Sequence, residues 1–244
     1  WHPGGDEENE IFSMDELIEK FSLEKVHKAG AIFDLEKLKW FQWQWQRRKH
    51  LEKVEAYAKE LEKNVKIEEE KRGHLNYHFK DPGNLEKLLD KKAEDLLALC
   101  EKYLPKEWEE NRGYLKKCIL TISEKVLQNP KTAKEYAEFY FTEKSYDKKL
   151  LTHEKMNVDE NMAKNALTKT KGLFEKLDDF SETKLRKELL KLIEEMKVKN
   201  GQILWPLRAA LTGESFSPGA FEVASALGKE KALERIEKAL ALLH

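Results

Sequence analysis

The C-terminal part of the chain holds the residues best suited to binding chemistry. Pro206 is followed two positions later by Arg208, and Ser217-Pro218-Gly219 stands a few residues further on. Such residues commonly begin helices, so the pattern predicts two helix starts with unpaired backbone N–H groups and Arg208 near the first. These donors could bind phosphates and base edges of a single-stranded nucleic acid. The alternative is two ordinary helix caps beside a surface arginine, and spacing alone favours it.

An aromatic and basic cluster lies nearer the N-terminus. Its rings alternate with glutamines and lead directly into three cations. Rings beside cations can stack bases and hold phosphates. The rings are better explained as helix residues with Trp40 and Trp43 on the core face, because aromatic residues at helical spacing are usually buried. For the cations, a solvated flank and a phosphate-contacting surface stay equally open. The cluster comprises Trp40, Trp43, Trp45, Arg47, Arg48 and Lys49.

No motif for catalysis stands in the sequence. Gly-rich phosphate loops, HExxH, Gly-x-Ser-x-Gly and the protein-kinase motifs are all missing. His74 and His78 would face one metal if their stretch were helical, but no third ligand stands nearby and Asp81-Pro-Gly ends the element. Asp178-Asp179 is interpreted as a solvated helix end, because adjacent residues do not face each other. We therefore expect no catalytic residue, no metal and no cofactor in this chain.

Composition narrows the class of protein further. The 244 residues carry 45 basic and 46 acidic side chains, for a net charge of -1, so any basic site has to be local. Charged residues make up 37% of the chain, which is typical of solvated helix faces on a sequence with 40% hydrophobic residues. No apolar run approaches the roughly 20 residues of a membrane helix, and no secretory leader is recognisable. With Cys100 and Cys118 interpreted as buried thiols, we expect a reducing, cytoplasmic location.

The spacing of apolar residues predicts a mainly all-α protein. Nearly every stretch has the helical period, and strand alternation is scarce. The helical pattern breaks near 28–34, where a small β element or turn is expected. The connections are short, so consecutive helices should pack as neighbours. Helices are expected over 14–21, 35–72, 85–104, 114–127, 132–141, 160–177, 181–196, 201–211, 217–227 and 229–243.

Capping residues mark several of these boundaries. Ser13 and Glu16 have the spacing of a capping box, and a turn is expected at 81–84 from its Asp-Pro-Gly-Asn chemistry. Further expected caps are Asp34, Ser181 and Ser217 at helix starts and Gly213 and Gly228 at helix ends.

Two segments resemble parts of bacterial-type glutamyl-tRNA synthetases. Near their C-terminus these enzymes have a Gly, then Pro-Leu-Arg-x-Ala-Leu-Thr-Gly, then Ser/Thr-Pro-Gly-x-Phe-Glu and a last helix. This chain has Gly201, then Pro206-Leu-Arg-Ala-Ala-Leu-Thr-Gly, then Ser217-Pro-Gly-Ala-Phe-Glu. Near its N-terminus, Trp1-His-Pro-Gly-Gly and Lys28-Ala-Gly-Ala-Ile-Phe-Asp are similar to the segment after the family's KMSKS loop. Both matches stand in the family's order, and a weaker resemblance covers 99–196.

The resemblance implies a tRNA-binding role. In the family, a Rossmann-type domain with HIGH and KMSKS motifs activates glutamate with ATP and Mg²⁺. Neither motif stands here, so the chain is expected not to be an enzyme by itself. The resemblance implies a stem-contact region at 1–97, with a helical insertion around 47–97, and two α-helical anticodon-binding subdomains at 98–145 and 146–244. The expected partner is glutamate tRNA, with glutamine tRNA as an alternative, bound by a monomer.

Family contacts with the anticodon carry over residue by residue. The family's Pro-Leu-Arg arginine corresponds to Arg208, and its Ser/Thr-Pro-Gly-x loop ends here at Ala220, which is smaller than the residue of some relatives. A further contact is an Arg, or a Gln in relatives that also charge glutamine tRNA, just before a Thr matching Thr132. Gln128 and Asn129 stand there instead. The expected site is Arg208, Ser217, Pro218, Gly219, Ala220, Gln128 and Asn129, with weak backbone contacts from Arg47, Arg48 and Lys49.

Two other classes of protein stay open. One is a free-standing synthetase-like paralogue that acts as a tRNA-binding or protein-interaction module, which a native start codon just before Trp1 would favour. The other is an unrelated helical scaffold without affinity for tRNA.

Overall fold

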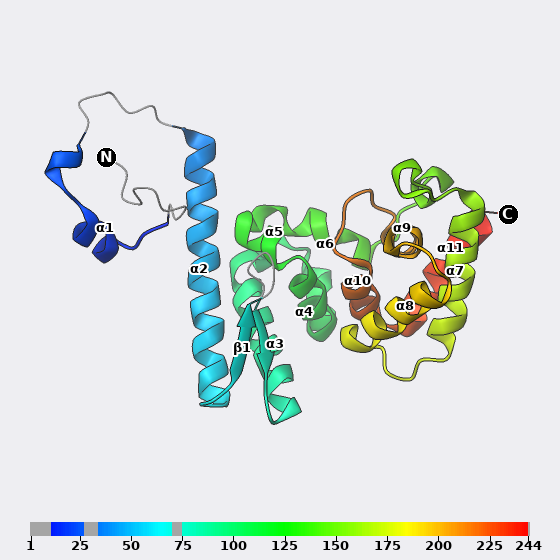
Figure 1. The fold of residues 1–244 in the computed structure, drawn as a ribbon, viewed down its shortest axis with the longest axis horizontal. Helices are drawn as coiled ribbons and strands as arrows, with labels where there is room; N and C mark the ends of the chain where they lie inside the picture. The colour runs from blue at the N-terminus through cyan, green and yellow to red at the C-terminus, as the bar shows by residue number, and fades with distance from the viewer. Residues whose placement is uncertain (1–10, 27–33, 70–74, 244) are drawn as a thin grey trace. The chain divides into compact units, whose positions relative to one another are not determined.

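The protein folds as an array of short helices, which confirms the all-α prediction. The computed structural model describes residues 11–26, 34–69 and 75–243. Within these ranges the chain forms eleven α-helices and one two-stranded sheet (Figure 1). None of these helices is both long and apolar enough to cross a membrane. The elements are α1 (Met14–Lys20), α2 (Leu35–Leu61), β1 (Lys66–Glu69), β2 (Leu75–His78), α3 (Pro82–Cys100), α4 (Arg112–Thr121), α5 (Ser123–Gln128), α6 (Ala133–Phe141), α7 (Glu160–Glu175), α8 (Glu182–Glu195), α9 (Asn200–Thr212), α10 (Ala220–Leu227) and α11 (Lys229–Leu242).

The chain divides into two compact units. The first runs to Leu88 and also takes in Leu127–Asn129, and the second comprises Leu89–Val126 and Pro130–His244. The three predicted regions, 1–97, 98–145 and 146–244, were defined by the part of the tRNA that each should contact. Two compact units do not test those contacts, so the three regions stay a prediction.

In the first unit, the C-terminal half of α2 packs against a β-hairpin. The strands pair antiparallel, with Ile67 opposite Tyr77. Val54 and Ala58 of α2 form the buried core with Leu88 of α3, and the Tyr77 ring packs against them. This small core is what holds the hairpin, since two isolated strands are marginal in water.

The hairpin corrects the prediction of one helix over 35–72. α2 ends at Leu61. Half-buried and exposed residues alternate along β2, but a strand of four residues is too short for this period of two to be recognised in the sequence. His78 therefore lies on a strand, where its ring meets the Glu68 carboxylate at 3.1 Å, and a helical spacing to His74 does not apply. His74 itself, and the β element expected near 28–34 up to residue 33, lie outside the described residues.

Most predicted caps are confirmed. The backbone N–H of Glu16 donates to Ser13 Oγ at 3.2 Å, and the Glu16 carboxylate accepts from the Ser13 backbone, which completes the capping box. The other confirmed caps are Asp34, Ser181, Gly213 and Gly228.

Two boundaries differ from the prediction. The residues expected to form a turn at 81–84 open α3 instead, because Asp81 accepts from the Gly83 N–H at 2.9 Å and Pro82 suits the first helical position. The helix expected over 114–127 is two helices, α4 and α5, with Ile122 between them.

In the second unit, α9 is the central helix. It packs against α7, α10 and α11, and Figure 1 shows it between α10 and α11. Seven of its thirteen residues are buried, so its neighbours fix its position more firmly than its own helix propensity does. Cys100 and Cys118 are buried free thiols, as predicted, and burial raises the pKa of each to about 12.

A buried arginine ties three of these helices together. Arg235 of α11 is 8% exposed and donates to the Leu211 carbonyl of α9 and, at 2.7 Å, to the Phe139 carbonyl of α6. Both carbonyls lie in the last turn of their helix, where no helical N–H reaches them. The guanidinium thus supplies hydrogen bonds to two buried carbonyl groups that would otherwise have no donor.

We expect Arg235→Met to lower the free energy of unfolding by about 3 kcal/mol, because two buried carbonyls lose a charged donor. Urea unfolding followed by far-UV circular dichroism measures the loss. The matched control is Lys238→Met, one turn further along α11, whose ion pairs with Glu143 and Glu234 lie at the surface and should contribute under about 1 kcal/mol. Similar losses for both variants would contradict the role assigned to Arg235.

Candidate nucleic-acid interface

Arg208 lies in the second half of α9 and not at its start. The helix begins at Asn200, which confirms the helix expected over 201–211, and the helix start placed at Pro206 is wrong. A proline inside a helix removes one backbone hydrogen bond, and burial of the Pro206 ring in the core offsets that loss. Arg208 consequently stands about one turn before the end of α9, beside the loop that leads to α10.

Gly213 ends α9 and turns the chain into that loop. Its φ of 66° lies in the left-handed region, and a Cβ there would approach Tyr146 Cδ1 to 3.1 Å and the Lys144 carbonyl to 3.4 Å. Both constraints demand glycine. The next residue is fixed as well, because the Glu214 N–H donates to Thr212 Oγ1 at 3.1 Å and its carboxylate meets Lys144 Nζ at 2.8 Å.

Arg208 braces the loop from within α9. Its Nη1 donates to the Glu214 carbonyl at 3.3 Å and to Ser217 Oγ at 2.8 Å, and its Nη2 donates to the Ser215 carbonyl at 3.0 Å. Burial lowers the pKa of the guanidinium, which still stays charged at neutral pH because its ordinary pKa is so high. One planar cation thus holds two carbonyl groups and one hydroxyl group of the loop.

Trp205 fixes the guanidinium in turn. The Arg208 Cζ lies 4.6 Å from the centre of the Trp205 ring, a cation–π contact. The Trp205 Nε1–H donates to the Leu150 carbonyl at 3.0 Å, and the His153 ring meets the indole edge-on at 4.2 Å. The indole is therefore held by Leu150 and His153, which lie about 50 residues earlier in the sequence.

The Ser-Pro-Gly segment lies outside the following helix. α10 begins at Ala220 with Gly219 as its N-cap, so the predicted start at Ser217-Pro218 is wrong. The physical reason is that Ser217 Oγ is taken by Arg208 and does not cap a helix. The carboxylate of Glu222 folds back over Gly219, where a Cβ would overlap it. Ala220 is buried and offers a base little surface, while Gly219 is exposed.

Gln128 and Asn129 are both exposed, at and just beyond the end of α5. They belong to the first compact unit, whereas Arg208 belongs to the second. Their predicted contact with the third anticodon base stays a prediction.

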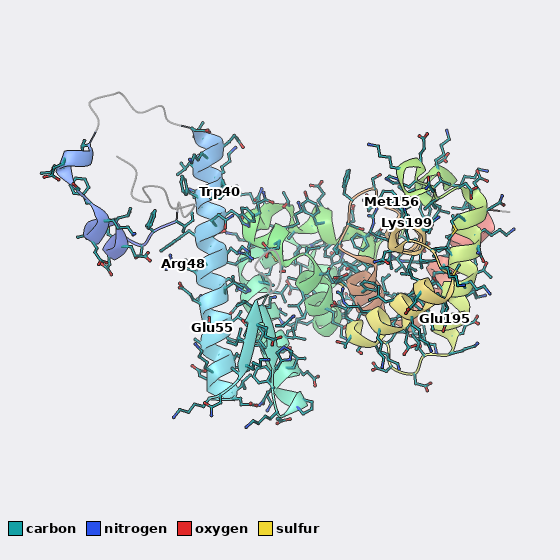
Figure 2. The ribbon with its side chains drawn as sticks, in the orientation of Figure 1. Trp40, Arg48, Glu55, Met156, Glu195 and Lys199 are labelled. Carbon is teal, nitrogen blue, oxygen red and sulfur yellow. The ribbon has the colours of Figure 1, made fainter. Side chains whose placement is uncertain are left out.

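The three cations of α2 differ in availability. Arg48, labelled on α2 in Figure 2, already pairs with Glu52 at 3.1 Å and with Glu16 at 3.5 Å. Lys49 is exposed, with its ammonium 5.3 Å from the Trp45 ring centre. Arg47 is half-buried. A phosphate would therefore meet Lys49 more readily than Arg48, which must first give up its carboxylates.

The aromatic residues of α2 correct one further interpretation. Trp40 is 39% exposed and so does not lie on the core face (Figure 2), while Trp43 is half-buried. The core of this unit packs on Val54 and Ala58, three or more turns further along α2. Trp40 is therefore outside the reach of that core.

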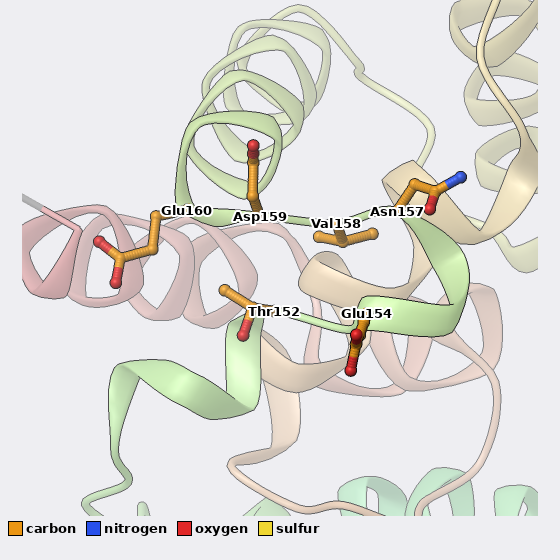
Figure 3. Close-up of a pocket in the computed structure, with 6 residues that line it drawn as sticks. All are labelled: Thr152, Glu154, Asn157, Val158, Asp159 and Glu160. Carbon is orange, nitrogen blue, oxygen red and sulfur yellow. The ribbon is translucent and has the colours of Figure 1, made fainter.

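An open depression of about 580 Å³ lies elsewhere in the second unit (Figure 3). Three of its lining residues are acidic, and only Glu160 has a described cation, Lys148 at 2.8 Å. Unpaired carboxylates repel phosphates, so this depression does not suit a nucleic acid. It is lined by Thr152, Glu154, Asn157, Val158, Asp159 and Glu160.

Some residues of the site were not foreseen in the sequence. Trp205 stands three positions before Arg208 and so shares its helix face, a spacing that does predict contact. Lys144 and Tyr146 lie about 70 residues before the loop they touch, and no local pattern reveals such partners.

Comparisons with known proteins identify the family of this chain. The family described as "Anticodon binding domain" matches residues 95–240, well over half of the chain, and the chain belongs to this family.

The relatives narrow the class of protein further. A glutamate–tRNA ligase of Clostridium botulinum strain Okra is 30% identical over 97% of this chain and 40% of its own length. One from Chloroherpeton thalassium is 31% identical over 98% of this chain and 41% of its own length. The crystal structure of a glutamate tRNA ligase from Elizabethkingia meningosepticum, in complex with its amino acid, aligns with a TM-score of 0.58 at 26% identity, covering all of this chain and 39% of that one. The resemblance to glutamyl-tRNA synthetases is thus confirmed, and the chain spans about 40% of the length of these relatives.

We expect Arg208→Lys to release the loop, because an ammonium cannot reproduce the planar fork that holds three acceptors at once. The free energy of unfolding should fall by about 1–2 kcal/mol, and amide hydrogen exchange should rise across 213–219. The matched control is Arg112→Lys on α4, an exposed arginine paired with Glu94 and Glu101, for which the loop should exchange as in the parent chain. Unaltered exchange in Arg208→Lys would show that the loop keeps its form without this arginine.

Proposed function

We propose that the chain is the tRNA-recognition part of a glutamyl-tRNA synthetase and contacts the anticodon loop of glutamate tRNA. The observation that carries the proposal is the loop braced by Arg208 between α9 and α10. It lies inside the region that matches the anticodon-binding family, and it contains Ser217, Pro218 and Gly219, to which the sequence resemblance assigns anticodon contacts. Relatives over nearly the whole chain are glutamate–tRNA ligases, which supports glutamate tRNA as the partner.

The hydrogen bonds of Arg208 explain how one residue could serve both the loop and an RNA base. A guanidinium has five N–H donors. Three of them go to the loop, which leaves two without a partner among the described residues. Two neighbouring donors are what a bidentate contact with a base edge or a phosphate needs. The loop contacts hold the guanidinium in place beforehand, so little entropy is lost when it binds.

Catalysis is assigned to a part of the protein outside this sequence. Neither the HIGH nor the KMSKS motif stands among the 244 residues, and the relatives extend well beyond the matched region. The chain by itself would therefore neither activate glutamate nor use ATP and Mg²⁺. A cytoplasmic monomer is the state that fits this role.

We expect the chain to bind a glutamate-tRNA anticodon stem-loop, and Arg208→Ala to cost about 1–3 kcal/mol of binding free energy. The cost should shrink when the contacted anticodon base is changed, since the lost contact is then already absent. Fluorescence anisotropy across a salt series measures both, and binding should weaken with salt. The control is Arg112→Gln, an exposed arginine paired with Glu94 and outside the loop. Equal losses for every anticodon would reduce Arg208 to a phosphate contact.

We expect little discrimination between glutamate and glutamine anticodon loops at the third anticodon base, because Gln128 and Asn129 replace the arginine of the family. Two stem-loops that differ only at this base should bind within a few-fold of each other. Gln128→Arg should introduce a preference for the glutamate loop of about 1–3 kcal/mol, the value of one good bidentate base contact. A strong preference in the parent chain would contradict the relaxed specificity and leave the proposed function standing.

A further inference from the structure

Phe216 is the most exposed large apolar side chain among the described residues. It is 90% exposed, against 76% for Leu23, the next in order. It stands in the loop between α9 and α10, on the same segment as Ser217 and Gly219. An aromatic ring exposed to water lacks the hydrophobic free energy that burial would supply, so its position calls for an explanation.

Freedom of the loop does not explain this exposure. Arg208 holds the carbonyls of Glu214 and Ser215 on one side of Phe216 and the hydroxyl of Ser217 on the other. Glu214 is further held by Lys144 and by the Thr212 hydroxyl. The backbone is thus fixed on both sides of the ring, and the ring is held out from the surface by a braced loop.

The surroundings of the ring suit an RNA base better than an apolar protein surface. The cation of Arg208 bonds the residues on either side of Phe216, and two of its N–H donors are left over beyond its three loop contacts. The one acidic side chain of the loop, Glu214, is paired at 2.8 Å with Lys144, which also pairs with Glu138 at 3.1 Å. A planar ring beside a cation is the arrangement on which unpaired bases stack, since every base has a π face.

We propose that Phe216 is a stacking surface for one unpaired base of the bound RNA loop. The inference rests on the proposed tRNA binding and adds a contact to it. Phe216 supplies affinity through the ring face, while Arg208 supplies directional hydrogen bonds to an edge or a phosphate. The stacked base would gain little sequence preference from the ring itself.

The test replaces the ring in the full chain by Ala, Leu or Trp and measures binding of a glutamate-tRNA anticodon stem-loop. Phe216→Ala should weaken binding roughly tenfold, the value of one base stacked on an aromatic ring. Phe216→Leu keeps an apolar side chain without a planar face and should lose most of the same affinity, whereas Phe216→Trp should bind at least as tightly as the parent chain. The matched control is Leu99→Ala, a truncation of another exposed apolar residue, which should bind as the parent does.

A second series locates the stacked base. Stem-loops with an abasic nucleotide at successive loop positions are bound to the parent chain and to Phe216→Ala. At one position the loss from Phe216→Ala should vanish, because the base that stacks is already absent. The slope of log affinity against log salt should be the same for both proteins, since stacking releases no counterions.

Each outcome is decisive. If the parent chain binds and the Ala, Leu and Trp variants all bind equally well, stacking is overturned and the proposed tRNA binding stands. If Leu retains the affinity of Phe, a merely apolar contact replaces stacking. If the parent chain binds no stem-loop, the proposed function fails, and the inference about Phe216 fails with it.

Discussion

The guanidinium of Arg208 is the group on which the loop between α9 and α10 depends. A loop of this length has many conformations, and ordering it costs backbone entropy at each residue. Three hydrogen bonds from one planar cation offset that cost, and they do so from a helix that is itself buried in the core. The ring of Trp205 keeps the cation from turning away. Without this group, Ser215, Phe216 and Ser217 would have few described contacts to hold them.

Contacts in the core of the second unit fix the position of this loop. α9 is fixed by packing on three helices, and its last turn is held by Arg235 at Leu211 and by Gly213 against Tyr146. These contacts set where α9 stops and hence where Arg208 stands. The loop therefore takes its geometry from buried and half-buried residues, while its exposed residues stay available to a partner.

Local chemistry made much of this fold predictable. Capping residues such as Ser13, Asp34 and Gly213 act on their immediate neighbours, so their roles could be inferred from a few adjacent residues. The β-hairpin was missed because four-residue strands show too short an alternation inside a highly charged stretch. Pro206 suggested a helix start by its preference for first turns, but burial in the core outweighed that preference.

The candidate site was predictable in composition and not in geometry. The sequence pointed to Arg208 and Ser217, but it could not show that the two side chains bond to each other. Such pairing depends on the sharp turn at Gly213, which brings residues nine positions apart within 2.8 Å. Lys144 meets Glu214 only because the tertiary fold joins distant segments.

The shared use of Arg208 has an evolutionary consequence. If the same guanidinium both shapes the loop and contacts the RNA, selection cannot adjust one property without disturbing the other, and the position is effectively frozen. Lineages that acquire a different anticodon preference would then change the residues around this arginine and keep the arginine itself.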